Sequence, residues 1–255
     1  MELMDDLGSR GIPFLFVISF DGSEVYVWQR EEVPESVRFA VPMCNGCGSF
    51  EKYEGGEVTF GMNPVSPERY GAAFDKVLYH LRRGDTYLIN LTMPTEIEAP
   101  LSLSQIYRYS NAPYRLLFDG RFVCFSPEIF VRITDGIISS YPMKGTIDAS
   151  VPAAEEKIVS DGKEFAEHNT IVDLIRNDLS MVATEVRVKR YRYIDRIETN
   201  RGALLQVSSE ISGKLMEELK GKPGTVMATL LPAGSVTGAP KERTVEILKE
   251  AEGYD

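Results

Sequence analysis

Hydrophobic residues in the first half of the chain fall into short runs separated by turn signals. The runs PFLFVISF and SEVYVWQR flank Asp21-Gly22, a dipeptide that favours tight turns, so they predict a β-hairpin. Further strands are predicted at TYLINLTMPTEIE, YRLLF, RFVCFS, IFVRIT and GIISSYPM. This half of the chain is therefore expected to be rich in β-strands.

A change to helical periodicity marks residues 66–84. Ser66 is a good N-cap, Pro67 suits the first helical position, and Gly84 is placed to end the helix. The predicted apolar stripe consists of Tyr70, Phe74, Val77, Leu78 and Leu81.

A second helix, expected from Lys163 to about Val182, carries two acids on its apolar stripe. At roughly 100° per residue, Glu167 and Asp178 share the face of the core residues. A carboxylate facing a core must be paired, hydrogen-bonded or bound to a cation, so Glu167 is either a Mg2+ ligand or part of a buried salt bridge. Asp178 is expected to cap or to pair locally with Arg176 or Asn177.

The second half adds strands at RVKRYRYI and ALLQVSSEISG, a short helix at PGTVMATLL and a last helix beginning at Pro240. Strands in hairpin-like runs with a few long helices predict an α+β fold and not a regular βαβ series. With 255 residues and 43% hydrophobic side chains, the chain can bury a substantial core in one large domain or two small ones.

Charge and patterning exclude several classes of function. The chain has 28 basic and 38 acidic side chains, a net charge of −10 that opposes binding to nucleic acid or anionic lipid. The early apolar run, residues 12–20, is too short and too β-like for a signal peptide or membrane span, which predicts a cytoplasmic protein. Cys44 and Cys47 have zinc-knuckle spacing without further ligands, so incidental thiols are the preferred interpretation.

Two residues outside the helices are candidates for chemistry. Lys144 stands between Pro142 and Gly145, where the backbone is expected to be neither helix nor continuing strand. It is a solvated loop residue unless burial or a cationic neighbour lowers its pKa and makes it a nucleophile. Glu128, after Pro127, is a general acid if its carboxyl faces an apolar cavity, and otherwise an exposed glutamate.

The segment GSVTGAPK, Gly234 to Lys241, has the composition of an anion-binding turn. Its glycines, hydroxyls and following helix start present N–H groups and a positive dipole end to a carboxylate or phosphate. It is not a Walker A loop. The two histidines, His80 and His168, suggest no Ser–His–Asp arrangement.

Four segments in order, FSPEIF, YPMKGT, AEHNTIVDLIRNDL and GSVTGAPK, resemble the chorismate-utilising enzyme family from about Arg82 to the C-terminus. The family includes anthranilate synthase component I, aminodeoxychorismate synthase component I, isochorismate synthase and salicylate synthase. The resemblance implies a four-layer α/β/β/α sandwich and a single chorismate-binding catalytic domain over residues 1–255.

The lysine in PMKGT resembles the aminodeoxychorismate synthases, whereas anthranilate synthases carry alanine there. By this resemblance Lys144 attacks C2 of chorismate, Glu128 protonates the departing 4-hydroxyl, and ammonia enters at C4, a step of p-aminobenzoate and folate biosynthesis. Glu167 matches a family Mg2+ ligand, and the ammonia would come from a separate glutamine amidotransferase subunit. The implied substrate-binding residues are Thr146, Gly234, Ser235, Thr237, Gly238 and Lys241.

The sequence departs from the family pattern in two places. Leu205 stands where the family usually has a histidine tied to pyruvate elimination, which fits a product that keeps its enolpyruvyl group. The chain stops at Asp255, whereas family members continue into further strands and a last helix with a second Mg2+ glutamate, so a truncated domain is expected. The alternatives are an isochorismate or salicylate synthase, which adds water at C2, and a non-catalytic chorismate-binding module.

Overall fold

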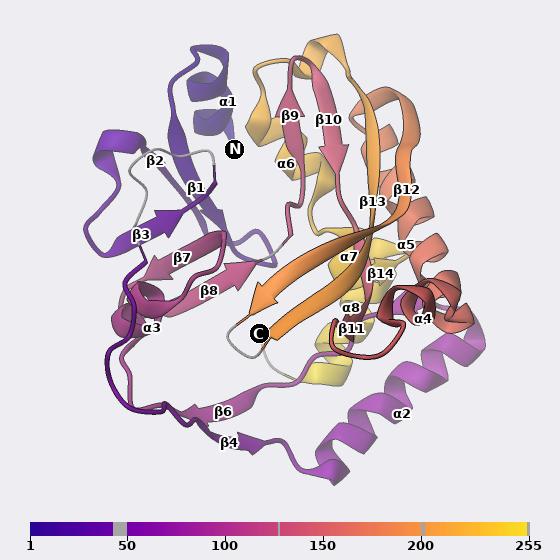
Figure 1. Ribbon diagram of the computed structural model, residues 1–255. Coiled ribbons are helices and arrows are strands. Elements are labelled where there is room, and N and C mark those ends of the chain that lie inside the picture. The colour runs from indigo at the N-terminus through magenta and orange to yellow at the C-terminus, as the bar shows by residue number, and fades with distance from the viewer. Residues whose placement is uncertain (43–49, 127, 200–201, 254–255) are drawn as a thin grey trace. The chain divides into compact units, whose positions relative to one another are not determined.

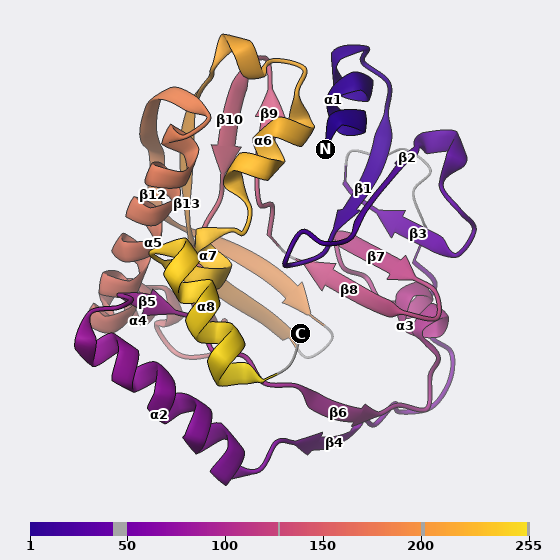
Figure 2. The ribbon, with the colours of Figure 1, turned by 180° about the vertical axis from the view of Figure 1, so that it is seen from behind.

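The computed structural model describes residues 1–42, 50–126, 128–199 and 202–253 (Figures 1 and 2). The chain forms two compact units, each made of two separate stretches of sequence. Unit 1 consists of Met1–Glu32 and Glu128–Ser235, and unit 2 of Val33–Pro127 and Val236–Asp255. Cys44 and Cys47 lie outside the described residues. Among the helices described, none is long and apolar enough to cross a membrane.

Unit 1 is built on a five-stranded antiparallel sheet whose central strand is β13 (Gly202–Leu215). One edge of β13 pairs with β10 (Ile137–Ser140) and then with β11 (Met143–Asp148), and the other edge pairs with β12 (Ala183–Thr199). Strand β9 (Arg132–Thr134) pairs with β10. One long strand therefore holds the separate strands of the unit in a common register.

Two helices pack against this sheet, α4 (Ala154–Ser160) and α5 (Gly162–Ser180) (Figures 1 and 2). Asp161 caps α5 by accepting hydrogen bonds from the N–H groups of Lys163 and Glu164. The predicted helix is confirmed, and its buried residues are His168, Ile171, Val172, Ile175, Asp178 and Leu179. Burial of this apolar face holds α5 on the sheet.

The remaining elements of unit 1 include the predicted hairpin, which is confirmed as β1 (Phe14–Ile18) and β2 (Val25–Gln29). A 3-10 turn (Arg30–Glu32) follows it, and another (Glu217–Leu219) precedes α6 (Pro223–Leu230). The N-terminal helix α1 (Glu2–Ser9), which the sequence patterns did not indicate, packs on α6. Asp5 of α1 accepts a 3.0 Å hydrogen bond from the N–H of Thr225, so α1 supplies a cap for α6.

Unit 2 contains a three-stranded sheet of β3 (Val37–Ala40), β7 (Tyr114–Phe118) and β8 (Phe122–Ser126). The helix α3 (Leu103–Tyr109) packs on β7 and β8. A two-stranded ladder joins β4 (Gly61–Pro64) to β6 (Thr95–Glu98). The predicted strand at residues 86–98 is thus broken, because only β5 (Leu88–Ile89) and β6 are extended and paired.

The second part of unit 2 pairs segments that lie far apart in the sequence. Strand β5 pairs with β14 (Gly238–Ala239), and α2 (Pro67–Arg83) packs on α8 (Lys241–Glu252). The one-turn helix α7 (Gly234–Thr237) leads from unit 1 into β14. This arrangement places the GSVTGAPK segment directly before α8.

Both predicted ends of α2 are confirmed. Ser66 accepts a 3.2 Å hydrogen bond from the N–H of Arg69, and Gly84 ends the helix with a φ of 77°. The predicted stripe is wrong at its N-terminal end, where Tyr70 and Phe74 are 48% and 44% exposed. The buried face of α2 is Ala73, Val77 and His80. We attribute the shift to α8, which packs on α2 and buries Val77 in a cluster with its own apolar residues.

Candidate functional site

Lys144 lies within β11 and not in a loop, which corrects the expectation from its neighbours. It pairs with Val207 of β13, and the register then shifts before Thr146 pairs with Gln206. The shift comes from Gly145, whose φ of 80° suits glycine and leaves one extra residue in the strand. A bulge of this kind redirects neighbouring side chains. Lys144 is half-buried on a paired strand, so its position is fixed more firmly than that of a loop lysine.

Close packing is a second reason for glycine at position 145. A Cβ there would lie 3.2 Å from Oε2 of Glu164 and 3.6 Å from Ile158. A side chain would therefore press on the helices that cover β11 as well as strain the bulge. Thr146, the next residue, is exposed.

Glu128 lies between β8 and β9, and its carboxyl interacts electrostatically with Lys144. Burial of the carboxyl raises its pKa above the usual value, while the positive charge of Lys144 acts in the opposite direction. The residue keeps exposed surface all the same. The two residues singled out for catalysis thus lie in one unit, and the charge of Lys144 acts on Glu128.

Glu167 is not the core-facing acid that its periodicity predicts. Its side chain is 43% exposed and makes a 3.5 Å ion pair with Lys163. His168, one residue later, takes the interior position of the helix. The buried face of α5 therefore keeps Ile171 and Asp178 of the predicted stripe but extends toward His168 and away from Glu167.

The exposure of Glu167 fits a cation ligand better than a buried salt bridge. Mg2+ is commonly held by one or two carboxylates together with water and substrate oxygens. Among the described residues, no three histidine, cysteine, aspartate or glutamate side chains gather into a metal site. Glu167 alone could therefore provide one ligand of such an ion.

His168 and Ser209 form a buried pair that no sequence pattern indicated. The Nε2 of His168 is 2.7 Å from the Oγ of Ser209. Burial, and then the positive charge of Arg192, lower the pKa of His168 to about 4. The Nδ1 of this imidazole has no hydrogen-bond partner among the described residues. Since no described residue orients the ring through Nδ1 and the pair is buried, it lacks the arrangement of a hydrolase dyad.

Asp178 contacts the start of GSVTGAPK and not Arg176 or Asn177. Its Oδ2 accepts a 3.3 Å hydrogen bond from the N–H of Gly234, whereas Arg176 pairs with Asp173 at 3.3 Å. Asp178 is 6% exposed, so this N–H helps to compensate for its burial. The N–H of Gly234 is thus used within the protein in this structure, and the expected role of Gly234 in binding the substrate stays a prediction.

Gly234 also needs its small size at this contact. A Cβ would lie 3.0 Å from the carboxylate of Asp178 and 3.0 Å from the side chain of Leu174. The turn is thereby held against α5, the helix that carries Glu167. Ser235, the next residue, is half-buried.

The rest of the GSVTGAPK segment is held by β5 in unit 2. The carbonyl of the buried Thr237 accepts a 3.3 Å hydrogen bond from the N–H of Asn90. Gly238 has a φ of 127°, and a Cβ on it would overlap the carbonyl oxygen of Leu88. Only glycine allows this approach of two backbones. Lys241, half-buried, begins α8 immediately afterwards.

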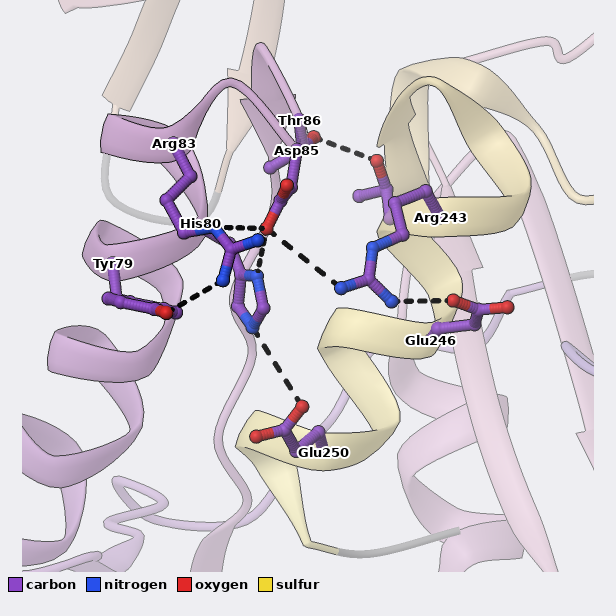
Figure 3. Close-up of polar contacts among 9 residues, drawn as sticks. Tyr79, His80, Arg83, Asp85, Thr86, Arg243, Glu246 and Glu250 are labelled. Carbon is purple, nitrogen blue, oxygen red and sulfur yellow. Dashed lines mark hydrogen bonds and ion pairs between the residues drawn. The ribbon is translucent and has the colours of Figure 1, made fainter.

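A polar network fixes α8 to the end of α2 (Figure 3). The Oγ1 atoms of Thr86 and Thr244, both buried, are 2.8 Å apart, and Thr86 Oγ1 also donates to the carbonyl of Ala239. His80 lies between two carboxylates, with Nδ1 2.6 Å from Asp85 and Nε2 3.8 Å from Glu250. The N-terminus of α8, and with it Lys241, is therefore held in a defined place relative to β5.

Comparison with known proteins gives a consistent result. The chorismate binding enzyme family matches residues 58–255. An uncharacterized PabA-like protein of Haemophilus influenzae is 45% identical over 253 residues, which cover 99% of this chain and 76% of that protein. Aminodeoxychorismate synthase component 1 of Escherichia coli is 32% identical over 202 residues, covering 74% of this chain and 43% of that protein.

Among solved structures, anthranilate synthase component I from Streptococcus pneumoniae matches with a TM-score of 0.61 at 26% identity. The match covers 78% of this chain and 46% of that one, so the chain spans less than half of that structure. The likeness confirms the expected α+β fold of the anthranilate synthase component I type.

Proposed function

Because this chain belongs to the family of chorismate binding enzymes, we propose that it aminates chorismate with ammonia to give 4-amino-4-deoxychorismate. The observation that carries the proposal is Lys144, half-buried on β11 and in electrostatic contact with Glu128. The 32% identity to aminodeoxychorismate synthase component 1 of Escherichia coli supports the same reaction. In this proposal the two units belong to one catalytic domain, and the reaction takes place in the cytoplasm.

In this proposal Lys144 and Glu128 share the proton that is later transferred to the departing hydroxyl of chorismate. Transfer of one proton from the ammonium of Lys144 to the carboxylate of Glu128 produces a neutral amine and a neutral acid at once. Burial raises the pKa of the Glu128 carboxyl and so favours its neutral form. The amine is then a nucleophile, and the carboxylic acid can protonate a leaving hydroxyl.

The two steps balance as successive displacements through the ring diene. The amine of Lys144 forms a bond to C2 of chorismate, both conjugated ring double bonds shift by one position, and the C4–O bond breaks as Glu128 protonates the departing oxygen to water. Ammonia then forms a bond to C4, both double bonds shift back, and the C2–N bond to Lys144 breaks. The extra proton of the incoming ammonia returns to Glu128, which restores the starting pair.

Other residues are assigned to binding. Glu167 would hold Mg2+, which when bound supplies positive charge for a substrate carboxylate. The residues proposed to bind the substrate are Thr146, Gly234, Ser235, Thr237, Gly238 and Lys241. The ammonia would come from a separate glutamine amidotransferase.

The test is incubation of the protein with chorismate, Mg2+ and an ammonium salt, followed by separation and mass analysis of the products. We expect 4-amino-4-deoxychorismate from the wild type and none from Lys144→Ala. Lys144→Arg is the matched control, because it keeps the charge without a usable nucleophile. A product of isochorismate or salicylate without any amine would contradict the proposal, as would full amination by Lys144→Ala.

A further inference from the structure

We propose that Ser209 and His168 are positioning residues, which hold the strand of Lys144 and the helix of Glu167 at the spacing that the reaction requires. The inference deepens the proposed function and rests on it for the roles of Lys144 and Glu167. It concerns unit 1 alone.

Ser209 joins three segments through one fully buried residue. Its backbone N–H donates a 3.0 Å hydrogen bond to the carbonyl of Pro142, two residues before Lys144. Its Oγ accepts a 3.0 Å hydrogen bond from the N–H of Arg192 in β12 and lies 2.7 Å from Nε2 of His168 in α5. Ser209 has no exposed surface, and His168 is 1% exposed. Ser209 thus contacts the residue just before β11 through its backbone N–H, and β12 and α5 through its hydroxyl, where water cannot take its place.

The hydroxyl of Ser209 is well matched to its two neighbours. A serine oxygen has one hydrogen and two acceptor positions. The N–H of Arg192 uses one acceptor position, and His168 uses either the other position or the hydrogen. Alanine at this position would leave both an amide N–H and an imidazole nitrogen unpaired inside the protein. The neighbouring segments would then move to find other partners.

Because His168 is next to Glu167 in α5, its contact with Ser209 also determines where Glu167 lies. Adjacent helical residues differ by about 100° in direction and 1.5 Å along the axis. Fixing the imidazole against β13 therefore sets both the rotation and the height of α5 at Glu167. Groups that orient a ligand residue in this way commonly change metal affinity or activity by about 10- to 100-fold when they are removed.

Ser208 provides a matched control beside Ser209. It is 1% exposed and belongs to the same strand, but its Oγ has no hydrogen-bond partner among the described residues. Side chains alternate along a strand, so Ser208 points to the opposite face of β13 from Ser209. The same chemical change at the two positions therefore removes a linking hydroxyl in one case and an unused hydroxyl in the other.

The kinetic experiment compares Ser209→Ala with Ser208→Ala in chorismate amination, with Mg2+ titrated in each. For Ser209→Ala we expect kcat to fall about 10- to 100-fold or the half-saturating Mg2+ concentration to rise by a similar factor. At saturating Mg2+, the KM for chorismate should stay within about threefold, because the proposed substrate-binding residues of GSVTGAPK keep their contacts. Ser208→Ala should keep wild-type values. Wild-type kcat and Mg2+ dependence in Ser209→Ala would overturn the proposal.

Substitution of His168 gives a second, independent comparison that does not need a stable Ser209→Ala protein. His168→Gln keeps a polar group within reach of Ser209, whereas His168→Leu does not. We expect His168→Gln to recover most of the kcat that His168→Leu loses. Equal kcat values for the two variants would show that His168 only fills space.

Hydrogen exchange tests the link without any chorismate chemistry. Peptides covering residues 163–170 and 188–194, which the hydroxyl joins, should exchange faster in Ser209→Ala than in the wild type and be unchanged in Ser208→Ala. Unchanged exchange in Ser209→Ala would refute the coupling. If the wild type fails to aminate chorismate, the proposed function fails, and this measurement still decides whether Ser209 and His168 hold the two segments.

Discussion

Substitution by alanine should lower the free energy of unfolding at Gly238 and raise it at Gly71. Gly238 has a φ of 127°, a conformation that costs any other residue about 1–3 kcal/mol. The added Cβ would also overlap the carbonyl oxygen of Leu88. The overlap involves two backbones, so it is relieved only if β5 moves away from β14.

Movement of β5 would break the backbone hydrogen bonds that join the two strands. These run from the N–H of Tyr87 to Ala239 and from the N–H of Asn90 to Thr237. At about 0.5–1.5 kcal/mol each, their loss adds about 1–3 kcal/mol to the conformational cost. Gly238→Ala is therefore expected to reduce the free energy of unfolding by about 2–6 kcal/mol.

Gly71 lies in the interior of α2, where a Cβ would meet no other atom within 4 Å. Alanine is favoured over glycine in a helix by about 0.5–1 kcal/mol, because glycine loses more backbone freedom on folding. Gly71→Ala should therefore stabilise the protein by about that amount. It controls for the chemistry of the substitution, since the two changes add the same methyl group.

Urea unfolding followed by far-UV circular dichroism measures both effects. The midpoint should fall for Gly238→Ala and rise slightly for Gly71→Ala, with the slope m unchanged in the second variant. In thermal unfolding the first change corresponds to a Tm lower by at least about 4 °C. A Gly238→Ala protein that unfolds at the wild-type urea concentration would refute the argument from backbone contact.

Three further changes test other contacts. Burial alone would raise the pKa of Asp5, but hydrogen bonds from Thr225 lower it below its usual value of 3.8. The stabilisation that the ionised Asp5 contributes is therefore complete above about pH 4 and is lost as the pH falls further. Asp5→Asn should cost about 1 kcal/mol at pH 7, with a difference from wild type that narrows in urea titrations below about pH 4; a constant difference would contradict this. Thr86→Val should lower the unfolding free energy by about 1–3 kcal/mol, and Thr86→Ser, which keeps the hydroxyl, by much less. Equal losses in urea unfolding would show that the hydroxyl of Thr86 does not stabilise the protein. Asp178→Ala removes the contact that holds the turn at Gly234 against α5, so it should raise the KM for chorismate about tenfold, and Asp178→Asn should restore it; an unchanged KM in steady-state kinetics would exclude the role.

Features that depend on neighbouring residues alone were predictable from the sequence. Ser66 and Gly84 mark the ends of α2 because capping and left-handed conformations are local chemistry. The N-terminal hairpin was predictable for the same reason, since its turn residues and strand pattern lie together. The α+β class followed from the order of these elements.

Features that depend on distant partners were predicted less well. Periodicity located α5 but could not decide whether Glu167 or His168 faces the sheet, because the partner of His168 lies 41 residues away. Asp178 was assigned to adjacent residues, whereas its observed partner Gly234 is 56 residues away. Pro142 and Gly145 indicated irregular backbone around Lys144, but a bulge in a paired strand could not be told from a loop without β13.

The pairing of β5 with β14 has a consequence for synthesis of the protein. Thr86 and Ala239, which this pairing joins, are 153 residues apart, and closing a flexible loop of that length costs about 4–5 kcal/mol in entropy. While a ribosome is still adding residues before Gly238, α2 and β5 have neither their strand partner nor α8 to cover Val77. Both stretches of unit 1, Met1–Glu32 and Glu128–Ser235, precede Val236 in sequence, so unit 1 can form first, which shortens the effective loop. Nascent chains halted before residue 236 should accordingly present α2 to chaperones and proteases, and become resistant once α8 has left the ribosome.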